Sequence, residues 1–491
     1  MNTDNSREGH QPDFPTAAKS LLKDAQLRRN VRHATNVITA KRARVVQEMP
    51  DWQELRSAGS AIRQNVLDHL DTYLTQFEEA CTRAGGQVHF ALDAAEANRI
   101  AIELLKSHAA GEVIKVKSMT TEEIGLNDAL ARVGIRAHET DLAELIIQLG
   151  NDKPSHIVVP ALHKNRPQVR ELFQREMGFP NLGDTPEDLA EAARIFLREK
   201  FLRIPVAISG ANFLIAETGG VCIVESEGNG RMCLTLPKVL IAVAGIEKVI
   251  PRFRDLEVFL QTLPRSATGE RMNPYNSIWT GVREDDGPQE FHVILLDNGR
   301  SEILRDAEAQ QTLKCIRCGA CQNVCPVYRQ TGGHAYGSVY AGPIGAILTP
   351  QLEHFQHSAS LPYASSLCGA CYEVCPVAIN IPEVLIHLRG EIVRRDQSTF
   401  SGKIDPWNIG MQVAAAIFMS GNRMALAQHL GRIGQTAVVS KNGFIEHLPL
   451  LLDGWTESRD LAPLPKQSFR QWWMERERMS KTHGGESGEG K

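Results

Sequence analysis

Cys315-Ile-Arg-Cys318-Gly-Ala-Cys321-Gln-Asn-Val-Cys325-Pro326 is the first of two cysteine runs in this chain, and Cys368-Gly-Ala-Cys371-Tyr-Glu-Val-Cys375-Pro376 is the second. Together they hold seven of the ten cysteines, so the thiols are concentrated in one segment. The first run has the spacing C-x2-C-x2-C-x3-C-P, in which three thiolates hold one iron–sulfur cluster and the fourth reaches a second cluster. The second run repeats only the last three cysteines, and Ser365 stands where its first would be. The segment therefore predicts two clusters with unequal sets of ligands.

The exchange of the fourth cysteine between clusters assigns the expected ligands. The first cluster is expected on Cys315, Cys318, Cys321 and Cys375, and the second on Cys325, Cys368 and Cys371. The spacing leaves the second cluster as a [3Fe–4S] centre or as a [4Fe–4S] centre with an open or oxygen-ligated iron. A zinc ribbon needs only two pairs of cysteines and would leave Cys321, Cys325 and Cys375 unexplained. Because each cluster holds one electron, two neighbouring clusters predict an electron relay.

Length and composition limit the number of domains, the class of function and the cellular location that we expect. A chain of 491 residues is too long for one hydrophobic core and predicts two or three domains. A formal net charge of −4 gives no reason to expect nucleic-acid binding as the main activity. The first fourteen residues do not resemble a secretory signal, and no apolar run approaches the ~20 residues that cross a bilayer. Clustered cysteines then indicate metal binding in a reducing compartment, so we expect a cytoplasmic protein.

The part before the cysteine runs divides in two. Residues 1–84 form a predicted helical arm, because apolar residues recur there at intervals of three and four. In residues 85–296 short apolar runs alternate with helical ones, which predicts an α/β domain with a mainly parallel sheet covered on both faces. The expected strands are Val88–Leu92, Val113–Val116, Ile135–Glu139, Ile157–Val159, Val206–Ile208, Val221–Val224 and Leu240–Val249.

Two Gly-rich turns flank the expected strand Val221–Val224, at strand ends, where α/β sheets bind ligands. Glu217 lies in the first turn and Glu225 and Arg231 in the second. Arg231 could pair with a carboxylate or phosphate, and the two glutamates are either catalytic carboxylates or caps of turns and helices. His156 is read as a structural or surface histidine. Neither turn matches a nucleotide-binding fingerprint, so a tightly bound flavin or NAD is not supported.

Residues 297–400 form the predicted cluster domain. Helices are expected over Ala307–Leu313 and Pro382–Val393, and a short helix over Ile344–Leu348. These helices favour the helical form of a two-cluster ferredoxin over the compact β form, and so does the long interval between the two cysteine runs.

Residues 401–491 form the last predicted part, with a helical stretch over Val413–Leu430 and a polar tail from Lys481 that is expected to be disordered. Four of the six tryptophans lie here, so this part either docks a partner or packs back on the chain's own domains. They are Trp407, Trp455, Trp472 and Trp473.

Several motifs in this order resemble the lactate utilization protein B family. They are the run Ser209–Gly220, the run Glu225–Arg231, the turn Lys117–Glu123 and the two cysteine runs. The resemblance covers nearly the whole chain. It implies a LUD domain of the NagB/RpiA/CoA-transferase-like class, an all-α ferredoxin domain with two clusters, and a family-specific C-terminal region.

The resemblance also implies a function. The family member is the iron–sulfur subunit of a bacterial system that oxidises L-lactate to pyruvate, and it acts with a cysteine-rich iron–sulfur protein and a second LUD protein. Electrons pass to an unidentified acceptor. By resemblance the second cluster is expected to be [4Fe–4S], although Ser365 departs from the pattern of related ferredoxins. The alternative is a ligand-binding or acyl/CoA-handling protein in which Glu217 is active and the clusters are structural.

Overall fold

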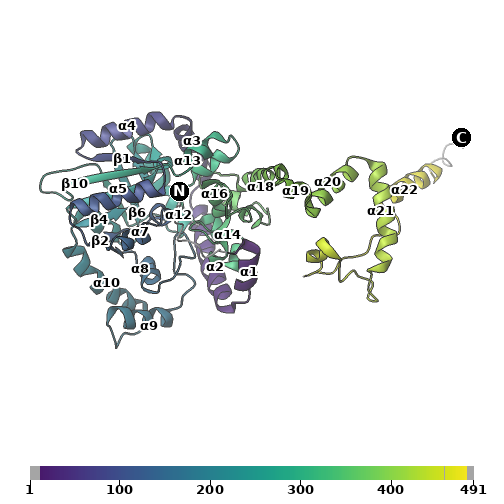
Figure 1. The fold of residues 1–491 in the computed structure, drawn as a ribbon, viewed down its shortest axis with the longest axis horizontal. Helices are drawn as coiled ribbons and strands as arrows, with labels where there is room; N and C mark the ends of the chain where they lie inside the picture. The colour runs from purple at the N-terminus through teal and green to yellow at the C-terminus, as the bar shows by residue number, and fades with distance from the viewer. Residues whose placement is uncertain (1–11, 458, 484–491) are drawn as a thin grey trace, which may run out of the picture. The chain divides into compact units, whose positions relative to one another are not determined.

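The computed structural model describes residues 12–457 and 459–483 (Figure 1). The chain divides into two compact units, one ending at Gly390 and one beginning at Glu391. The first unit contains the predicted arm, the α/β domain and both cysteine runs. The boundaries of the four parts expected from the sequence stay predictions.

A six-stranded parallel sheet lies at the centre of the first unit, with the strand order β1-β10-β7-β4-β2-β3. It confirms the expected α/β domain with a mainly parallel sheet. Its strands are β1 (Gln87–Ala91), β2 (Glu112–Lys115), β3 (Arg136–Glu139), β4 (Val206–Ser209), β7 (Val239–Gly245) and β10 (Glu290–Leu296).

Helices cover both faces of this sheet because successive side chains of each strand point to opposite sides. On one face, alternate strand residues pack on α3 (Trp52–Asp68) and α4 (Leu70–Arg83). On the other face, the intervening residues pack on α5 (Ala94–Ser107) and α7 (Leu126–Arg132) (Figure 1). The helical arm thus supplies part of the cover of the α/β domain.

A second, mixed sheet has the order β8-β5-β6-β9. Its strands are β5 (Phe213–Ile215), β6 (Gly220–Glu225), β8 (Val249–Ile250) and β9 (Tyr275–Trp279). The expected strand Val221–Val224 therefore lies in this sheet as part of β6, antiparallel to β5 and β9. The connection between β5 and β6 is too short for a parallel crossover, which needs a dozen residues or more.

Two expectations about strands were wrong. Ile157–Val159 is irregular, because its backbone N–H groups bond to side chains: Ile157 donates to Gln322 Oε1 (3.2 Å), and Val158 and Val159 donate to His156 Nδ1 (both 3.0 Å). The expected run Leu240–Val249 is interrupted by the 3-10 turn η1 (Ile246–Lys248) and continues in the second sheet.

The rest of the first unit is helical. A lobe of α8 (Leu142–Leu149), α9 (Arg166–Met177) and α10 (Pro186–Arg203) has its own core. Six of the seven cysteines in the two runs, all but Cys368, share a larger core with α2 (Ala25–Gln47), α12 (Leu256–Ala267) and the second sheet. The remaining elements of the unit are α1 (Phe14–Leu21), α6 (Met119–Glu123), α11 (Asn229–Thr235), η2 (Phe253–Asp255), α13 (Arg300–Arg305), η3 (Ala309–Lys314), α14 (Ala320–Val324), α15 (Tyr328–Thr331), η4 (His334–Tyr336), α16 (Gly342–Leu352), η5 (Leu361–Tyr363) and α17 (Ala370–Glu373), and α18 (Ile381–Ser398) contains the boundary between the units.

The second unit is built from short segments. Its elements are α19 (Phe400–Lys403), α20 (Pro406–Phe418), α21 (Gly421–Gly434), η6 (Gln435–Ala437), η7 (Leu450–Trp455) and α22 (Phe469–His483). All four of its tryptophans are exposed. The expected disordered tail lies outside the described residues from residue 484 on. Among the described residues, no helix combines the length and apolar character that crossing a membrane needs.

Candidate iron–sulfur sites

The two cysteine runs fold into the same local turn. Gly319 and Gly369 have φ of 72° and 83° and stand at the start of α14 and α17. The residues before the second and fifth cysteines, Arg317 and Leu367, also have positive φ, 60° and 54°. A left-handed residue is strained unless it is glycine, so Arg317 and Leu367 indicate a backbone held in place to aim side chains.

The first expected set of thiols comes together from both runs. Cys315, Cys318, Cys321 and Cys375 are all buried. Burial raises the pKa of Cys318, and the charges of Cys375 and Cys315 raise it further. Burial likewise raises the pKa of Cys375 to about 11, with Cys315 among its charged neighbours. Cys375 therefore lies beside the first run although it belongs to the second.

The second expected set also joins the two runs. Burial, with the charges of Cys325 and Cys368, raises the pKa of Cys371 to about 12. Cys325 and Cys371 are buried, whereas Cys368 is exposed. Cys371 also adds to the raised pKa of Cys321, after burial and the charges of Cys318 and Cys315. The two sets are thus neighbours, and only the second reaches the surface.

The donor set fits iron–sulfur clusters. Buried thiols that raise one another's pKa cannot ionise together without a multivalent cation among them, and thiolates are the usual ligands of such clusters. Backbone N–H groups point at the sulfur atoms, and such hydrogen bonds tune the reduction potential. They are Arg317 N–H to Cys315 Sγ (3.3 Å), Tyr328 N–H to Cys325 Sγ (3.5 Å) and Ile379 N–H to Cys375 Sγ (3.4 Å).

Ser365 occupies the position that Cys315 has in the first run. The N–H of Leu367 donates to Ser365 Oγ at 3.1 Å, as the N–H of Arg317 donates to Cys315 Sγ at 3.3 Å. Both bonds join residue i+2 to the side chain of residue i. The hydroxyl oxygen of Ser365 therefore has the local setting of a ligand sulfur.

The arm holds the second run in place. From α2, Arg42 donates to Val374 O (2.9 Å), and from α3, Arg56 donates to Cys375 O (2.8 Å) and Tyr372 O (3.0 Å). These are charge-assisted bonds to carbonyls next to ligand positions. The arm thus covers the sheet and also fixes the cysteine segment.

A buried ionic network ties the α/β domain to the first run. Arg300 bonds to Glu123 (2.8 Å) and Glu247 (2.6 Å), and Arg317 bonds to Glu247 (3.3 Å). Burial raises the pKa of Glu247, but the charges of Arg300, Lys248 and Arg317 lower it to about 2 overall. Glu247 is therefore ionised at neutral pH, and the network is paired rather than neutralised by protons.

A pocket of about 220 Å³ lies where the α/β domain meets the first cysteine run. It is at the carboxyl ends of β2, β4 and β7, the usual position of ligand crevices in α/β sheets. Segments 116–120, 210–212 and 223–227 line it together with Asn229, and Lys248 and Arg317 complete one side. No cysteine lines the pocket, so it is separate from the cluster sites.

The three weak catalytic candidates are spread out. Glu225 lines the pocket, but its carboxylate accepts the N–H groups of Gly230 (2.9 Å) and Arg231 (2.7 Å). Glu217 is exposed and accepts the N–H of Phe253 (2.8 Å), and the exposed Arg231 bonds to Ser277 Oγ (3.3 Å). Neither of the last two lines the pocket. Both glutamates thus serve as caps in this structure.

Sequence reasoning missed Lys248, which burial gives a pKa lowered to about 7. It lies in the run Leu240–Val249, which the sequence predicted as one continuous strand. Only the end of β7 at Gly245 could have indicated that Lys248 lies beyond the strand, at the edge where ligands bind. Arg317 was visible inside the first cysteine run, but nothing in the spacing indicated that it also lines a pocket.

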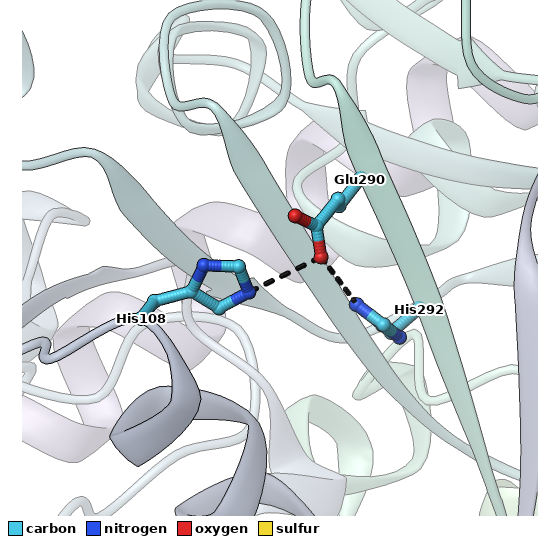
Figure 2. A group of neighbouring side chains, drawn as sticks. All are labelled: His108, Glu290 and His292. Atoms are coloured by element: carbon cyan, nitrogen blue, oxygen red, sulfur yellow. Dashed lines mark ion pairs between the residues drawn. The ribbon is translucent and has the colours of Figure 1, made fainter.

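Two other groups of metal-binding residue types lie among the described residues. In one, Glu290 pairs with His108 (3.2 Å) and His292 (3.5 Å) at the start of β10 (Figure 2). The other is Asp152, His163 and His334. The first is at the opposite end of the strands from the pocket, and neither contains a cysteine. In the second group Asp152 pairs with His163 (3.1 Å), so both groups contain internal ion pairs.

Comparison with known families agrees with this anatomy. Residues 74–296 match the LUD domain family, and residues 311–379 match the 4Fe-4S dicluster domain family. The second match spans both cysteine runs, so this segment is an iron–sulfur domain. A DUF162 family structure from Deinococcus radiodurans covers 46% of this chain and 98% of its own, at 14% identity and a TM-score of 0.27, which is too low to bear on the fold.

Curated relatives match over almost the full length. "Lactate utilization protein B" of Oceanobacillus iheyensis is 45% identical over 89% of this chain and 91% of its own, and that of Bacillus subtilis is 42% identical over 93% and 95%. The "uncharacterized electron transport protein YkgF" of Escherichia coli is 41% identical over 96% and 98%. At this identity and coverage, the chain belongs to the lactate utilization protein B family.

Proposed function

We propose that this protein is the iron–sulfur electron-transfer subunit of a system that oxidises L-lactate to pyruvate. The observation that carries the proposal is the arrangement of seven thiols in two adjoining sets, each drawing on both cysteine runs. The names of the relatives supply the metabolic setting, since they are called lactate utilization and electron transport proteins.

Each set would hold one cluster. Cys315, Cys318, Cys321 and Cys375 would hold a [4Fe–4S] cluster with four thiolates. Cys325, Cys368 and Cys371 would hold the second, with Ser365 Oγ in the fourth position. The N–H of Leu367 at 3.1 Å orients that oxygen in the way a ligand is usually oriented by an outer hydrogen bond.

The exposure of the two sets indicates where the relay meets a partner. When bound, the clusters supply one-electron storage at two adjoining points. The first set is enclosed beside the α/β pocket, whereas Cys368 opens the second set to the surface. Three apolar residues that flank Cys368 in the sequence are also exposed: Tyr363, Leu367 and Tyr372. Electrons would therefore be exchanged with a partner at the second cluster.

The partners in this proposal are a cysteine-rich iron–sulfur protein and a second LUD protein. One of them would carry electrons to or from the exposed edge of the second cluster, and the final acceptor is a further component.

The alternative of an acyl- or CoA-handling enzyme with structural clusters depended on Glu217. This carboxylate is exposed, caps a backbone N–H group and lies outside the pocket. We therefore favour electron transfer, and expect Glu217→Ala to leave lactate-dependent electron transfer by the reconstituted three-protein system unchanged.

The test is iron and sulfide analysis with EPR of the anaerobically reconstituted protein, as isolated and after reduction. Cys375→Ser and Cys371→Ser form a matched pair, four residues apart in one run. We expect the first to alter only the signal of the first cluster and the second only that of the second cluster. Cys233→Ala, a buried cysteine outside both sets, is the control and should leave both signals unchanged. Stoichiometric zinc without iron and sulfide would overturn the proposal.

A further inference from the structure

The pocket beside the first cysteine run has hydrogen-bond donors without partners. Arg317 is one: its side chain is 8% exposed, and its Nη1 is buried with no hydrogen-bond acceptor among the described residues. Its other contacts are Cys315 Sγ, Glu247 (3.3 Å) and the ring of Tyr340, 4.8 Å away. An unpaired buried guanidinium N–H costs free energy, so a missing acceptor is expected.

Lys248 lines the same side of the pocket and is also buried. Its amine makes no hydrogen bond or ion pair with any residue in the described part of the chain. A buried lysine is almost always paired. Among the described residues, Arg317 thus has one nitrogen without an acceptor, and the neighbouring Lys248 has no partner for its amine. Together they indicate that the acceptor is an anion from outside the chain.

The carboxylates that line the pocket accept backbone N–H groups, and among the described residues none of them pairs with Lys248 or Arg317. Asp141 accepts from Ala143 (3.0 Å) and Glu144 (3.1 Å). Glu227 accepts from Leu142 (3.0 Å), and Glu225 caps the turn that follows it. The third cation of the pocket, Lys117, is already bonded to Ile157 O.

The volume limits the size of the ligand. About 220 Å³ lies below the range of roughly 300–1,000 Å³ that is usual for pockets of drug-sized ligands, so the pocket suits a small ligand. The pocket also contains Asn273, whose Oδ1 is buried without a donor. A ligand with a hydroxyl group besides its anionic group would satisfy this oxygen too.

We propose that this pocket binds a small carboxylate through Arg317 and Lys248. That the ligand is a three-carbon 2-hydroxy or 2-oxo acid rests on the proposed function, whereas anion binding rests on the unpaired donors alone. Because the backbone N–H of Arg317 also donates to Cys315 Sγ, the bound carboxylate lies next to the first cluster site and not the second.

The test is calorimetric titration of the full-length, anaerobically reconstituted protein with L-lactate, with pyruvate and with uncharged L-lactamide. We expect at least one of the two acids to bind and L-lactamide to bind at least tenfold more weakly. Lys248→Gln and Arg317→Gln should each weaken acid binding at least tenfold. Arg231→Gln, an exposed arginine outside the pocket, is the matched control and should bind as the unchanged protein does.

EPR gives a second readout that is independent of activity. Ligand addition should shift the signal of the first cluster and leave that of the second unchanged. Iron content shows whether Arg317→Gln has kept its clusters, and if it has not, Lys248→Gln decides. Failure of both acids to bind, or equal binding by Lys248→Gln, would overturn the pocket while leaving electron transfer intact. If the unchanged protein binds the acid but contains no iron after reconstitution, the proposed function is overturned and the pocket stands.

Discussion

Ser365 tests, at the scale of one residue, how the second cluster is completed. Its hydroxyl accepts the backbone N–H of residue i+2, as the sulfur of Cys315 does. We therefore expect it to hold the fourth iron of the second cluster. Ser365→Ala removes this oxygen and should yield a [3Fe–4S] centre with about one iron per chain fewer. Ser365→Cys should keep that iron. Iron analysis and EPR of the oxidised proteins measure the difference.

The neighbouring Ser366 provides a control, because it lies in the same loop outside the ligand spacing. Ser366→Ala should retain the iron content of the unchanged protein. If Ser365→Ala also retains it, the fourth iron is bound by something other than this hydroxyl.

His156 carries a prediction about pH. It is fully buried, and burial with the charge of Lys117 lowers its pKa to about 3, despite the bond to Asn323 Oδ1 (3.2 Å). Its Nδ1 accepts two backbone N–H groups, so the neutral Nε2–H tautomer is the one that fits. The unfolded chain takes up a proton near pH 6.5 and the folded chain does not, so stability is present above pH 6.5 and is lost as pH falls from there towards 3.

Between pH 7 and pH 5.5 this loss should be about 1 kcal/mol. His156→Gln keeps an acceptor and a donor but cannot titrate, so its stability should fall by that much less over the same interval. Anaerobic urea denaturation of both proteins at the two pH values measures this. Parallel pH dependences would show that His156 is not the group responsible.

Arg63 acts at the scale of elements, because one side chain from α3 joins two regions. It donates to Val249 O of β8 (3.0 Å), to Leu313 O (2.8 Å) and Lys314 O (3.3 Å) before the first cysteine run, and to Glu247 O. Arg63→Met should cost about 3 kcal/mol of unfolding free energy, because it leaves these buried carbonyls without donors. Denaturant unfolding of the anaerobic protein measures the loss.

Arg83→Met is the matched control, since the exposed pair of Arg83 with Glu79 at 3.8 Å contributes roughly 0.5 kcal/mol or less. A similar loss for both variants would mean that the contacts of Arg63 do not hold the two regions together.

Some elements of this fold could be predicted from the sequence and others could not. The cysteine segment was accessible because its ligands lie within short runs whose spacing reflects one local turn. The parallel sheet was accessible because alternating apolar runs and helices have few other solutions. Ile157–Val159 misled because β-branched residues resemble a strand, whereas Gln322, distant in sequence, takes one of its N–H groups. The pocket was hidden for the same reason: Lys117, Lys248 and Arg317 come together only through the fold.

The second unit is the part of the molecule that we expect to bind a partner through apolar side chains. Its helices leave large apolar side chains exposed, including Phe400, Phe418 and Phe469 at 80%, 71% and 71%. Exposed aromatic residues of this kind form binding hot spots, so we expect this unit to dock a partner subunit. A chain ending at Ser398, where α18 ends, should keep its iron, sulfide and EPR signals but lose stable association with the two partner proteins.

Co-purification and lactate-dependent electron transfer in the reconstituted system measure this association. Because both cysteine runs and the pocket lie in the first unit, the shortened chain should still bind a small carboxylate. Trp472→Ala with Trp473→Ala in the full chain tests the same surface without removing it and should weaken association at least tenfold. Full association and electron transfer by the shortened chain would place the partner on the first unit, where the exposed edge around Cys368 would then be the docking surface.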